Sequence, residues 1–181
     1  MVRSVRGWVF NIFYLNVDPV ICAQQHIDKH VVKMPIELCQ MLVTARVMKG
    51  DLPKDTKYYT YRMRNHPCSV WVRNDWYGFS YTEELLAALC DEYWYRYGHK
   101  KNKRHESGEF YKSLPKTNMQ KMFEHRRRRK AVPLAVKEYP KFLCPVETYK
   151  NYYVQDKQRI ANWTGRPVPE WYTKEEQWEL S

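Results

Sequence analysis

Residues 22–40, CAQQHIDKHVVKMPIELCQ, form a helical pattern with two different faces. At about 100° per residue, one stripe holds only hydrophobic side chains and is typical of a face that packs into a core. Its members are Ile27, Val31, Met34, Leu38, Met41 and Ala45. A second stripe, about a quarter turn away, holds side chains that donate, accept or titrate. Its members are Cys22, His26, His30, Lys33, Glu37 and Gln40.

Glu37 and His30 are seven residues apart in this polar stripe and therefore share a helix face. A carboxylate can act as a general acid or base. The nearby amines of Lys29 and Lys33 can hold a phosphate, the role that we favour, or attack a sugar C1′ and form a Schiff base. The pattern indicates glycosidic-bond chemistry on DNA. Its predicted catalytic residues are Glu37, His30 and Lys33, and its predicted DNA contacts are Lys29, His26 and Gln40.

Other interpretations of the polar stripe stay open. Its thiolate and imidazoles suit zinc, with Cys22, His26 and His30 as ligands and His66 or Cys68 to complete the site. Three ligands from one helix are an unusual arrangement, and we expect no metal cofactor. An ordinary solvated or packed polar face is the structural alternative.

The charge of the chain points to a polyanion. The formal net charge is +11, and two dense basic runs, HKKNKRH at 99–105 and HRRRRK at 125–130, contribute to it. Such runs contact phosphates without choosing a sequence, unless they are simply a solvated edge. The second run supplies further predicted DNA contacts: Arg126, Arg127, Arg128 and Arg129.

Tyrosines are interleaved with basic residues in two places, at 57–64 and at 149–157. This combination can stack an unpaired base while holding its backbone, although many of these tyrosines can equally be core. The stretch NHPCSVWVR at 65–73 adds polar side chains that could line a pocket. The predicted nucleic-acid contacts from these regions are Arg62, Arg64, Asn65, His66 and Arg73.

The elements that must position these residues are mainly helical. At 181 residues, 44% of them hydrophobic, the chain predicts one compact domain over 1–181 with a proper core. Residues 8–15, WVFNIFYL, predict a short buried strand or extended segment. Asp18 and Pro19 are a good helix start. The helix that follows should run to Gly50 and be kinked or split at Pro35.

The rest of the chain predicts further helices. One should begin near Asn65 and continue to Gly98, with a break at Gly78. A basic loop at 99–109 should precede a helix around 118–130, and an extended stretch at 133–145 should precede a last helix from Pro145.

Cellular location follows from what the sequence lacks. Five cysteines without close pairing indicate reduced thiols. No apolar run approaches the ~20 residues of a membrane span, and the N-terminus lacks the features of a secretory signal. We expect a cytoplasmic protein of a phage or bacterial host, with no membrane partner.

The segments NIFYLNVDP, CAQQHIDKHVVKM, NHPCSVWVR and EELLAALCDEYWYRYG resemble a group of small phage-type proteins described as pyrimidine dimer DNA glycosylases, similar to the repair enzyme endonuclease V. The resemblance covers residues 10–98, and TYKNYY at 148–153 adds to it. It implies an all-α fold, an extruded nucleotide, a catalytic carboxylate at Glu37 seven residues after His30, and a nucleophilic N-terminal amine.

The chain begins about ten residues before the matching segment. Either this extension folds back, or a lysine replaces the amine, or the chemistry differs. The leading hypothesis is a DNA glycosylase, with or without lyase activity, that acts on a damaged or modified base. The alternatives are a noncatalytic DNA- or RNA-binding protein and, third, a zinc-dependent nuclease or deaminase.

Overall fold

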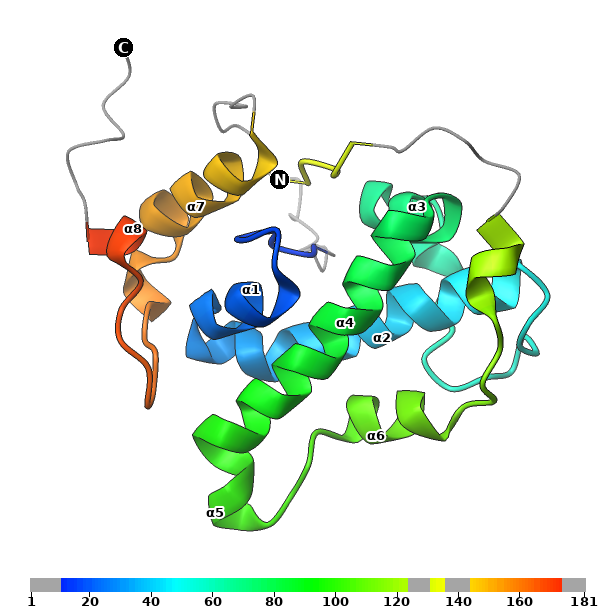
Figure 1. Cartoon of the computed structure of the whole chain (residues 1–181), viewed down its shortest axis with the longest axis horizontal. Coiled ribbons are helices and arrows are strands. Elements are labelled where there is room, and N and C mark those ends of the chain that lie inside the picture. The colour runs from blue at the N-terminus through cyan, green and yellow to red at the C-terminus, as the bar shows by residue number, and fades with distance from the viewer. Residues whose placement is uncertain (1–10, 124–130, 136–143, 174–181) are drawn as a thin grey trace, which may run out of the picture.

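The computed structural model describes residues 11–123, 131–135 and 144–173, and all regular secondary structure within these ranges is helical (Figure 1). The predicted mainly α fold is confirmed. Of the predicted short buried strand or extended segment at 8–15, the described part does not form a strand. Residues 11–15 have no regular secondary structure, although all five are buried. Residues 1–10, 124–130 and 136–143 lie outside the described ranges, so the rest of that segment and the run 125–130 do too.

The first two helices are α1 (Pro19–Gln25) and α2 (Asp28–Met48). The predicted start of α1 is confirmed, because Asp18 accepts hydrogen bonds from the backbone of Val20 and Ile21 at 2.8 and 3.1 Å. The predicted split at Pro35 is wrong, since α2 continues through that residue. The break lies instead at residues 26–27, where the backbone is extended.

The predicted helix over 65–98 is two helices, α3 (Pro67–Asn74) and α4 (Trp76–Tyr93), followed by the π-helical turn η2 (Trp94–Gly98). The break lies at Asp75, whose carboxylate accepts from the N–H of Gly78 at 3.1 Å. Gly78 is therefore in the first turn of α4. A Cβ there would lie 2.8 Å from the Trp71 ring, so the glycine allows α3 and α4 to approach closely.

The remaining elements of the described ranges are four helices and three short turns. The predicted loop at 99–109 instead contains α5 (His99–Lys101) and the start of α6 (Glu106–Ser113). Three short turns are η1 (Tyr61–Met63), η3 (Met119–Phe123) and η4 (Gln158–Ile160). Helix α7 (Pro145–Asp156) begins as predicted, and α8 (Glu170–Thr173) follows η4.

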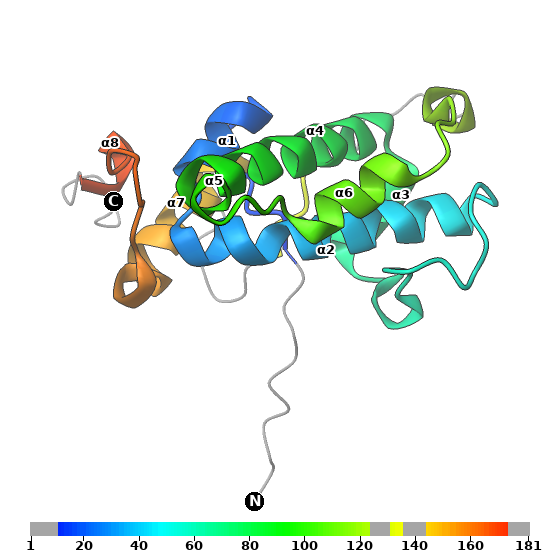
Figure 2. The ribbon, with the colours of Figure 1, turned by 90° about the horizontal axis from the view of Figure 1, so that it is seen from below.

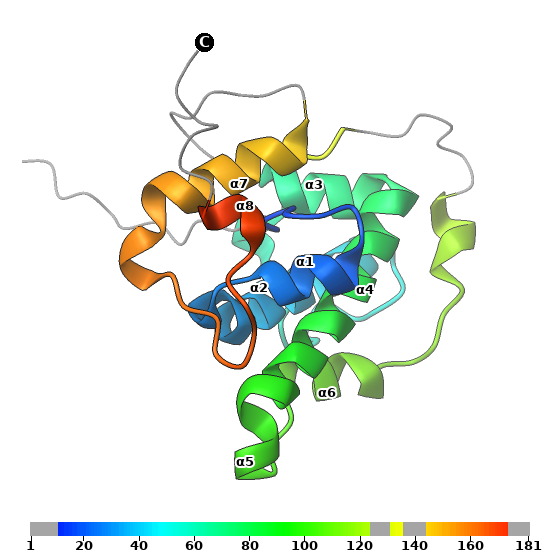
Figure 3. The same cartoon turned by 60° about the vertical axis from the view of Figure 1, so that its left-hand side comes forward.

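Helix α2 lies at the centre of the fold and packs against α3, α4 and α6, while α1 packs against α4 (Figure 2). Figure 3 shows α7 and α8 beside α1, at one end of α2. The hydrophobic stripe of α2 is buried as predicted, together with Leu85 and Leu89 of α4. Within the described ranges, no helix has both the length and the apolar character needed to cross a membrane.

Candidate functional site

The polar stripe of the first two helices is mostly buried. Cys22 and His26 are fully buried, and His30 and Glu37 are only 6% and 3% exposed. Lys33 differs, because 43% of its side chain is exposed. The segment 11–15 and helix α7 supply the residues that contact this stripe. The chemically capable face of the sequence is thus an interior polar layer that reaches solvent at Lys33.

Glu37 is held by two different elements. Its Oε2 accepts the backbone N–H of Asn11 at 3.2 Å, and its Oε1 lies 2.7 Å from Nζ of Lys33. Burial raises the pKa of Glu37, while the hydrogen bond and charge of Lys33 and the N–H of Asn11 lower it, and the net direction is upward. The carboxyl group therefore takes up a proton more readily than an exposed glutamate does.

The segment 11–13, whose backbone donates to Glu37, is held in place by hydrogen bonds of the Asn11 side chain. The side-chain oxygen of Asn11 accepts from the N–H groups of Ile12 and Phe13 at 2.8 and 3.2 Å, and its Nδ2 donates to the carbonyl of Ala135 at 3.2 Å. These bonds fix the backbone that donates to Glu37. The carboxylate is consequently preorganised by a local turn and by a residue far along the chain.

His30 belongs to an aromatic cluster. Its Nδ1 lies 2.5 Å from the hydroxyl of Tyr153, and the ring of Phe13 stacks on it at 4.4 Å with an interplanar angle of 12°. Phe13 has a φ of +49°, in the left-handed region that side chains rarely adopt. Burial lowers the pKa of His30 well below its usual value, and the neighbouring basic groups His26, Lys157 and Lys33 lower it further because they disfavour a second positive charge beside them. The imidazole is neutral at physiological pH.

The predicted DNA contact by His26 is wrong. This side chain is fully buried, and its Nδ1 donates to the carbonyl of Cys22 at 2.7 Å. Burial lowers the pKa of His26 to about 4, so it carries no charge for a phosphate. The cause is the break at residues 26–27, which turns His26 into the core.

The zinc ligands that the sequence suggested are not assembled in the part of the chain that the structure describes. No group of three or more His, Cys, Asp or Glu side chains there could hold a metal ion. Cys22 donates to the carbonyl of Phe13 at 3.4 Å, and the Nδ1 of His66 caps α3 by accepting from the N–H of Cys68 at 3.3 Å. The proposed ligands are thus engaged separately.

Three predicted contacts on and after η1 form one arginine cluster, which consists of Arg62, Arg64 and Arg73. Arg62 is exposed, and the guanidinium of Arg64 lies 3.5 Å from the ring centre of Tyr61. Arg73 donates to the carbonyl of Arg64 at 2.7 Å, which brings α3 against this turn. Cations and an exposed aromatic ring therefore meet at one place, as their interleaving suggested.

The other predicted contacts are more scattered. Asn65 is exposed beside the arginine cluster, and His66 is half-buried because it caps α3. On α2, Lys29 is exposed and Gln40 is half-buried. Of the tyrosines at 149–153, Tyr149 and Tyr153 are fully buried and thus core, while Tyr152 is half-buried under Lys157 at 4.6 Å. Arg126, Arg127, Arg128 and Arg129 lie outside the described residues.

Sequence reasoning missed a buried charge network centred on Arg96. This side chain is 2% exposed and donates to Glu92 at 2.7 Å and Asp28 at 2.8 Å. It also donates to the carbonyls of His26 and Gln24, both at 3.0 Å, which satisfies the C-terminal end of α1. The sequence signal was Glu92 and Arg96 at helical spacing among aromatics, a pattern that is otherwise typical of a solvated pair.

The C-terminal segment completes this network. Arg166 donates to Glu92 at 2.9 Å, and the backbone and hydroxyl of Thr164 donate to Asp28 at 2.9 and 2.8 Å. Although burial alone raises the pKa of Asp28, hydrogen bonds from Thr164, Tyr97 and Arg96 lower it overall. Fully paired in this way, the network fixes the junction between α1 and α2, and hence the start of the helix that carries Lys33 and Glu37.

A cavity of about 580 Å³ lies away from Glu37, which is not among its lining residues. It is formed by α4, α6 and residues 114–119, and its wall is mainly apolar with Arg46 and Lys112 among the lining residues. Arg46 is already engaged there by Asp51 and by the carbonyl of Pro115.

Comparison of the chain with protein-family models, curated proteins and solved structures finds no match in any of the three.

Proposed function

We propose that this protein is a DNA glycosylase in which Glu37 is the catalytic carboxylate. The supporting observation is a carboxyl group only 3% exposed, with a raised pKa, that lies 2.7 Å from the amine of a half-exposed lysine. A raised pKa suits a carboxyl group that must donate a proton near neutral pH. The net charge of +11 and the resemblance to pyrimidine dimer glycosylases support DNA as the substrate.

The two groups would divide the chemistry between them. A glycosylase acts on a nucleotide taken out of the base stack, so the sugar has to reach the buried carboxyl group. Glu37 would protonate the sugar oxygen or, when ionised, stabilise an oxocarbenium-like centre. Lys33 would hold the phosphate beside the extruded nucleotide from the solvent side. The segment 11–13 covers Glu37 and His30, so access on the side of Lys33 requires the least rearrangement.

Base release is the direct test. Duplexes that carry damaged or modified bases are incubated with the protein, and free base is measured before borohydride is added to trap any Schiff base. Glu37→Gln should lower release at least about a hundredfold, the usual contribution of an acid or base, while DNA affinity stays within about twofold. Glu84→Gln, on the exposed side of α4, is the matched control and should change neither value.

The same experiment separates the two roles of Lys33. Lys33→Ala should weaken DNA binding and flatten its salt dependence if the amine holds a phosphate. Loss of the trapped complex with affinity unchanged would instead make Lys33 the nucleophile, which forms the N–C1′ bond as the base leaves with the electron pair. If the protein releases no base and forms no trapped complex over a broad panel of bases, the glycosylase proposal is wrong.

A noncatalytic DNA- or RNA-binding protein is the second candidate. It is favoured by the burial of His30 and Glu37 beneath Phe13 and Asn11, which serves a structural polar layer as well as a pocket. In that case wild-type protein binds without releasing any base, and Glu37→Gln leaves its affinity unchanged.

A further inference from the structure

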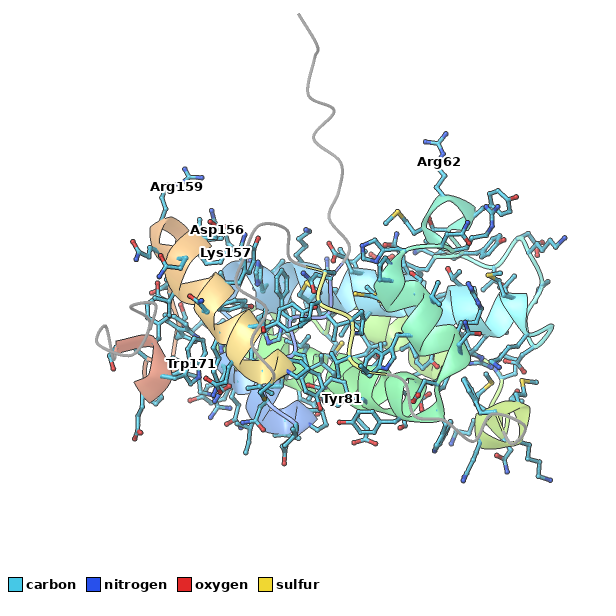
Figure 4. All side chains as sticks on the ribbon, turned by 90° about the horizontal axis from the view of Figure 1, so that it is seen from above. Arg62, Tyr81, Asp156, Lys157, Arg159 and Trp171 are labelled. Carbon is cyan, nitrogen blue, oxygen red and sulfur yellow. The ribbon has the colours of Figure 1, made fainter. Side chains whose placement is uncertain are left out.

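Two groups of cations lie at opposite ends of one side of the molecule. Figure 4 shows Lys157 and Arg159 at one end, where α7 gives way to η4, and Arg62 at the other, on η1. Arg62 and Arg159 project to the same side. Figure 2 shows that α2 lies along this side, with η4 and η1 near its two ends. Residues almost a hundred positions apart in sequence therefore share one surface.

Both groups are available to an external anion. The ion pairs among the described residues leave Arg62, Arg64, Lys157 and Arg159 without an acidic partner. One carboxylate, Asp156, is exposed beside Lys157 and reduces the charge of that end by one. The arginine cluster at the other end carries Arg73 as well, held against Arg64 by its hydrogen bond to the carbonyl.

The distance between the two ends suits a rigid polyanion. Helix α2 has 21 residues, and at about 1.5 Å per residue it is on the order of 30 Å long. At ~3.4 Å per base pair, this length corresponds to about nine base pairs of duplex DNA. Duplex DNA is stiff over ~150 base pairs, so one straight segment can reach both ends without being ordered first, unlike a single strand.

We propose that duplex DNA lies along this side of the molecule, held by the arginine cluster at one end and by Lys157 and Arg159 at the other, with α2 beneath its middle. The inference rests on the proposed function only in its choice of DNA as the partner. It adds where the duplex lies and which residues at the far end hold it. Lys33, in the first half of α2, would then lie between the two phosphate contacts.

The test measures binding of unmodified DNA, which needs no catalysis. A labelled duplex of about 20 base pairs is titrated at salt concentrations from about 50 to about 200 mM. One variant combines Arg62→Ala with Arg64→Ala, and a second combines Lys157→Ala with Arg159→Ala. Each should lower affinity about tenfold or more at low salt and reduce the slope of log affinity against log salt by up to about 1.8, since each lost phosphate contact removes about 0.9.

A control variant removes the same charge elsewhere. Lys116→Ala with Lys121→Ala takes two exposed cations from η3 and the loop before it, which the sequence did not assign to DNA, and should leave affinity and slope unchanged. If it weakens binding as much as the other two, only the overall charge matters and the proposed path is wrong. If either end variant binds the long duplex like wild type, that end does not touch DNA and the proposal fails.

Duplex length provides a sharper criterion. A duplex of about six base pairs, ~20 Å long, is too short to reach both ends at once. Removing one end should therefore weaken its binding by no more than about twofold, whereas the long duplex loses about tenfold. Equal losses for both lengths, or tighter binding of a single strand of the longer length, would overturn the proposal. Because the DNA carries no damaged base, failure of base release would leave this result unaffected.

Discussion

The backbone N–H of Asn11 donates to Oε2 of Glu37 at 3.2 Å, while Nζ of Lys33 lies 2.7 Å from Oε1 of the same carboxylate. The two oxygens are thus held by different parts of the chain, the segment before α1 and the first half of α2. Only Lys33 among these partners is substantially exposed. Burial raises the pKa of Glu37, whereas Lys33 and the N–H of Asn11 lower it, and the balance between these causes can be tested.

Glu37→Gln should leave the protein as stable as wild type, or more stable by no more than about 1 kcal/mol, at pH 7.5. Burial raises the folded-state pKa of Glu37 above its ordinary value of 4.5, so the fold favours the protonated form and loses that stabilisation as pH rises through the folded pKa. Glutamine mimics the protonated form. Urea unfolding at pH 7.5 and pH 4 measures the free energy of unfolding of variant and wild type. The difference between the two proteins should vanish at pH 4.

A clear loss of stability in Glu37→Gln at pH 7.5 would show that the ion pair with Lys33 outweighs burial, contrary to this expectation. Glu84→Gln on the exposed side of α4 serves as the control and should match wild type at both pH values.

Acidification should begin to lower the free energy of unfolding near pH 6.5, which is above the pH at which ordinary carboxylates titrate. Burial lowers the pKa of His26 from 6.5 to about 4, so the stability it contributes is complete above pH 6.5 and is lost as pH falls toward 4. At about 1.4 kcal/mol per pKa unit, His26 alone accounts for about 3 kcal/mol over this window. His30, whose pKa burial also lowers, adds to the loss. Urea midpoints at pH 7.5, 5.5 and 4.5 measure it.

His26→Asn isolates the titration, because its amide can still donate to the carbonyl of Cys22 but takes up no proton. The variant should be less stable than wild type at pH 7.5 and should lose less stability on acidification. A wild-type free energy of unfolding that stays constant between pH 7.5 and 4.5 would refute the expectation. The raised pKa of Glu37 acts in the opposite direction over the same window and reduces the total change.

Arg96→Lys should lower the free energy of unfolding by about 2 to 4 kcal/mol, because a buried acceptor left without a donor costs about 1 to 3 kcal/mol. Lysine cannot reproduce the four hydrogen bonds that the guanidinium donates to Glu92, Asp28 and two carbonyls, so buried acceptors lose their donors. Arg166→Lys, which affects a half-exposed partner of Glu92, should have a smaller effect. Chemical denaturation ranks them, with the exposed Arg104→Lys as control. A loss below about 1 kcal/mol for Arg96→Lys would contradict the network's role.

Gly78→Ala should destabilise the protein by about 1 kcal/mol or more. The added Cβ would lie 2.8 Å from the Trp71 ring and 3.0 Å from the Trp71 carbonyl, so α3 and α4 must separate. This outweighs the gain of about 1 kcal/mol that alanine brings to a helix interior. Thermal unfolding tests it against Glu84→Ala, an exposed substitution in the same helix that should be neutral or stabilising. A variant as stable as wild type would mean that α3 yields without strain.

Hydrophobic periodicity predicted the core face of α2 correctly. Apolar side chains such as Val31, Met34 and Leu38 become buried against any apolar neighbour, so the prediction did not require knowing which element covers them. The helix boundaries were harder to predict. Pro35 breaks a local rule yet lies inside α2, whereas the actual break at residues 26–27 is stabilised by Arg96, seventy residues away in sequence. Local patterns cannot register a break whose hydrogen-bond partners come from elsewhere in the chain.

The polar stripe shows a second limit. Helical spacing correctly placed His30 and Glu37 on one side of α2, but the spacing says nothing about what covers that side. Phe13 and Tyr153 cover His30, and Asn11 covers Glu37. A neighbouring segment without regular secondary structure thus converts a face that looks solvated into an interior layer.

The network around Arg96 bears on how the protein is made. Its members come from residues 24–28, 92–96 and 164–166, so Asp28 and Glu92 obtain their last partners only when residue 166 has left the ribosome. Until then Arg96 alone can serve these acceptors, and the bonds that Thr164 and Arg166 donate to Asp28 and Glu92 are missing. The N-terminal half of the nascent chain therefore cannot reach its final arrangement until residues 164–166 have emerged, so this part of the fold is completed by a segment made well after it.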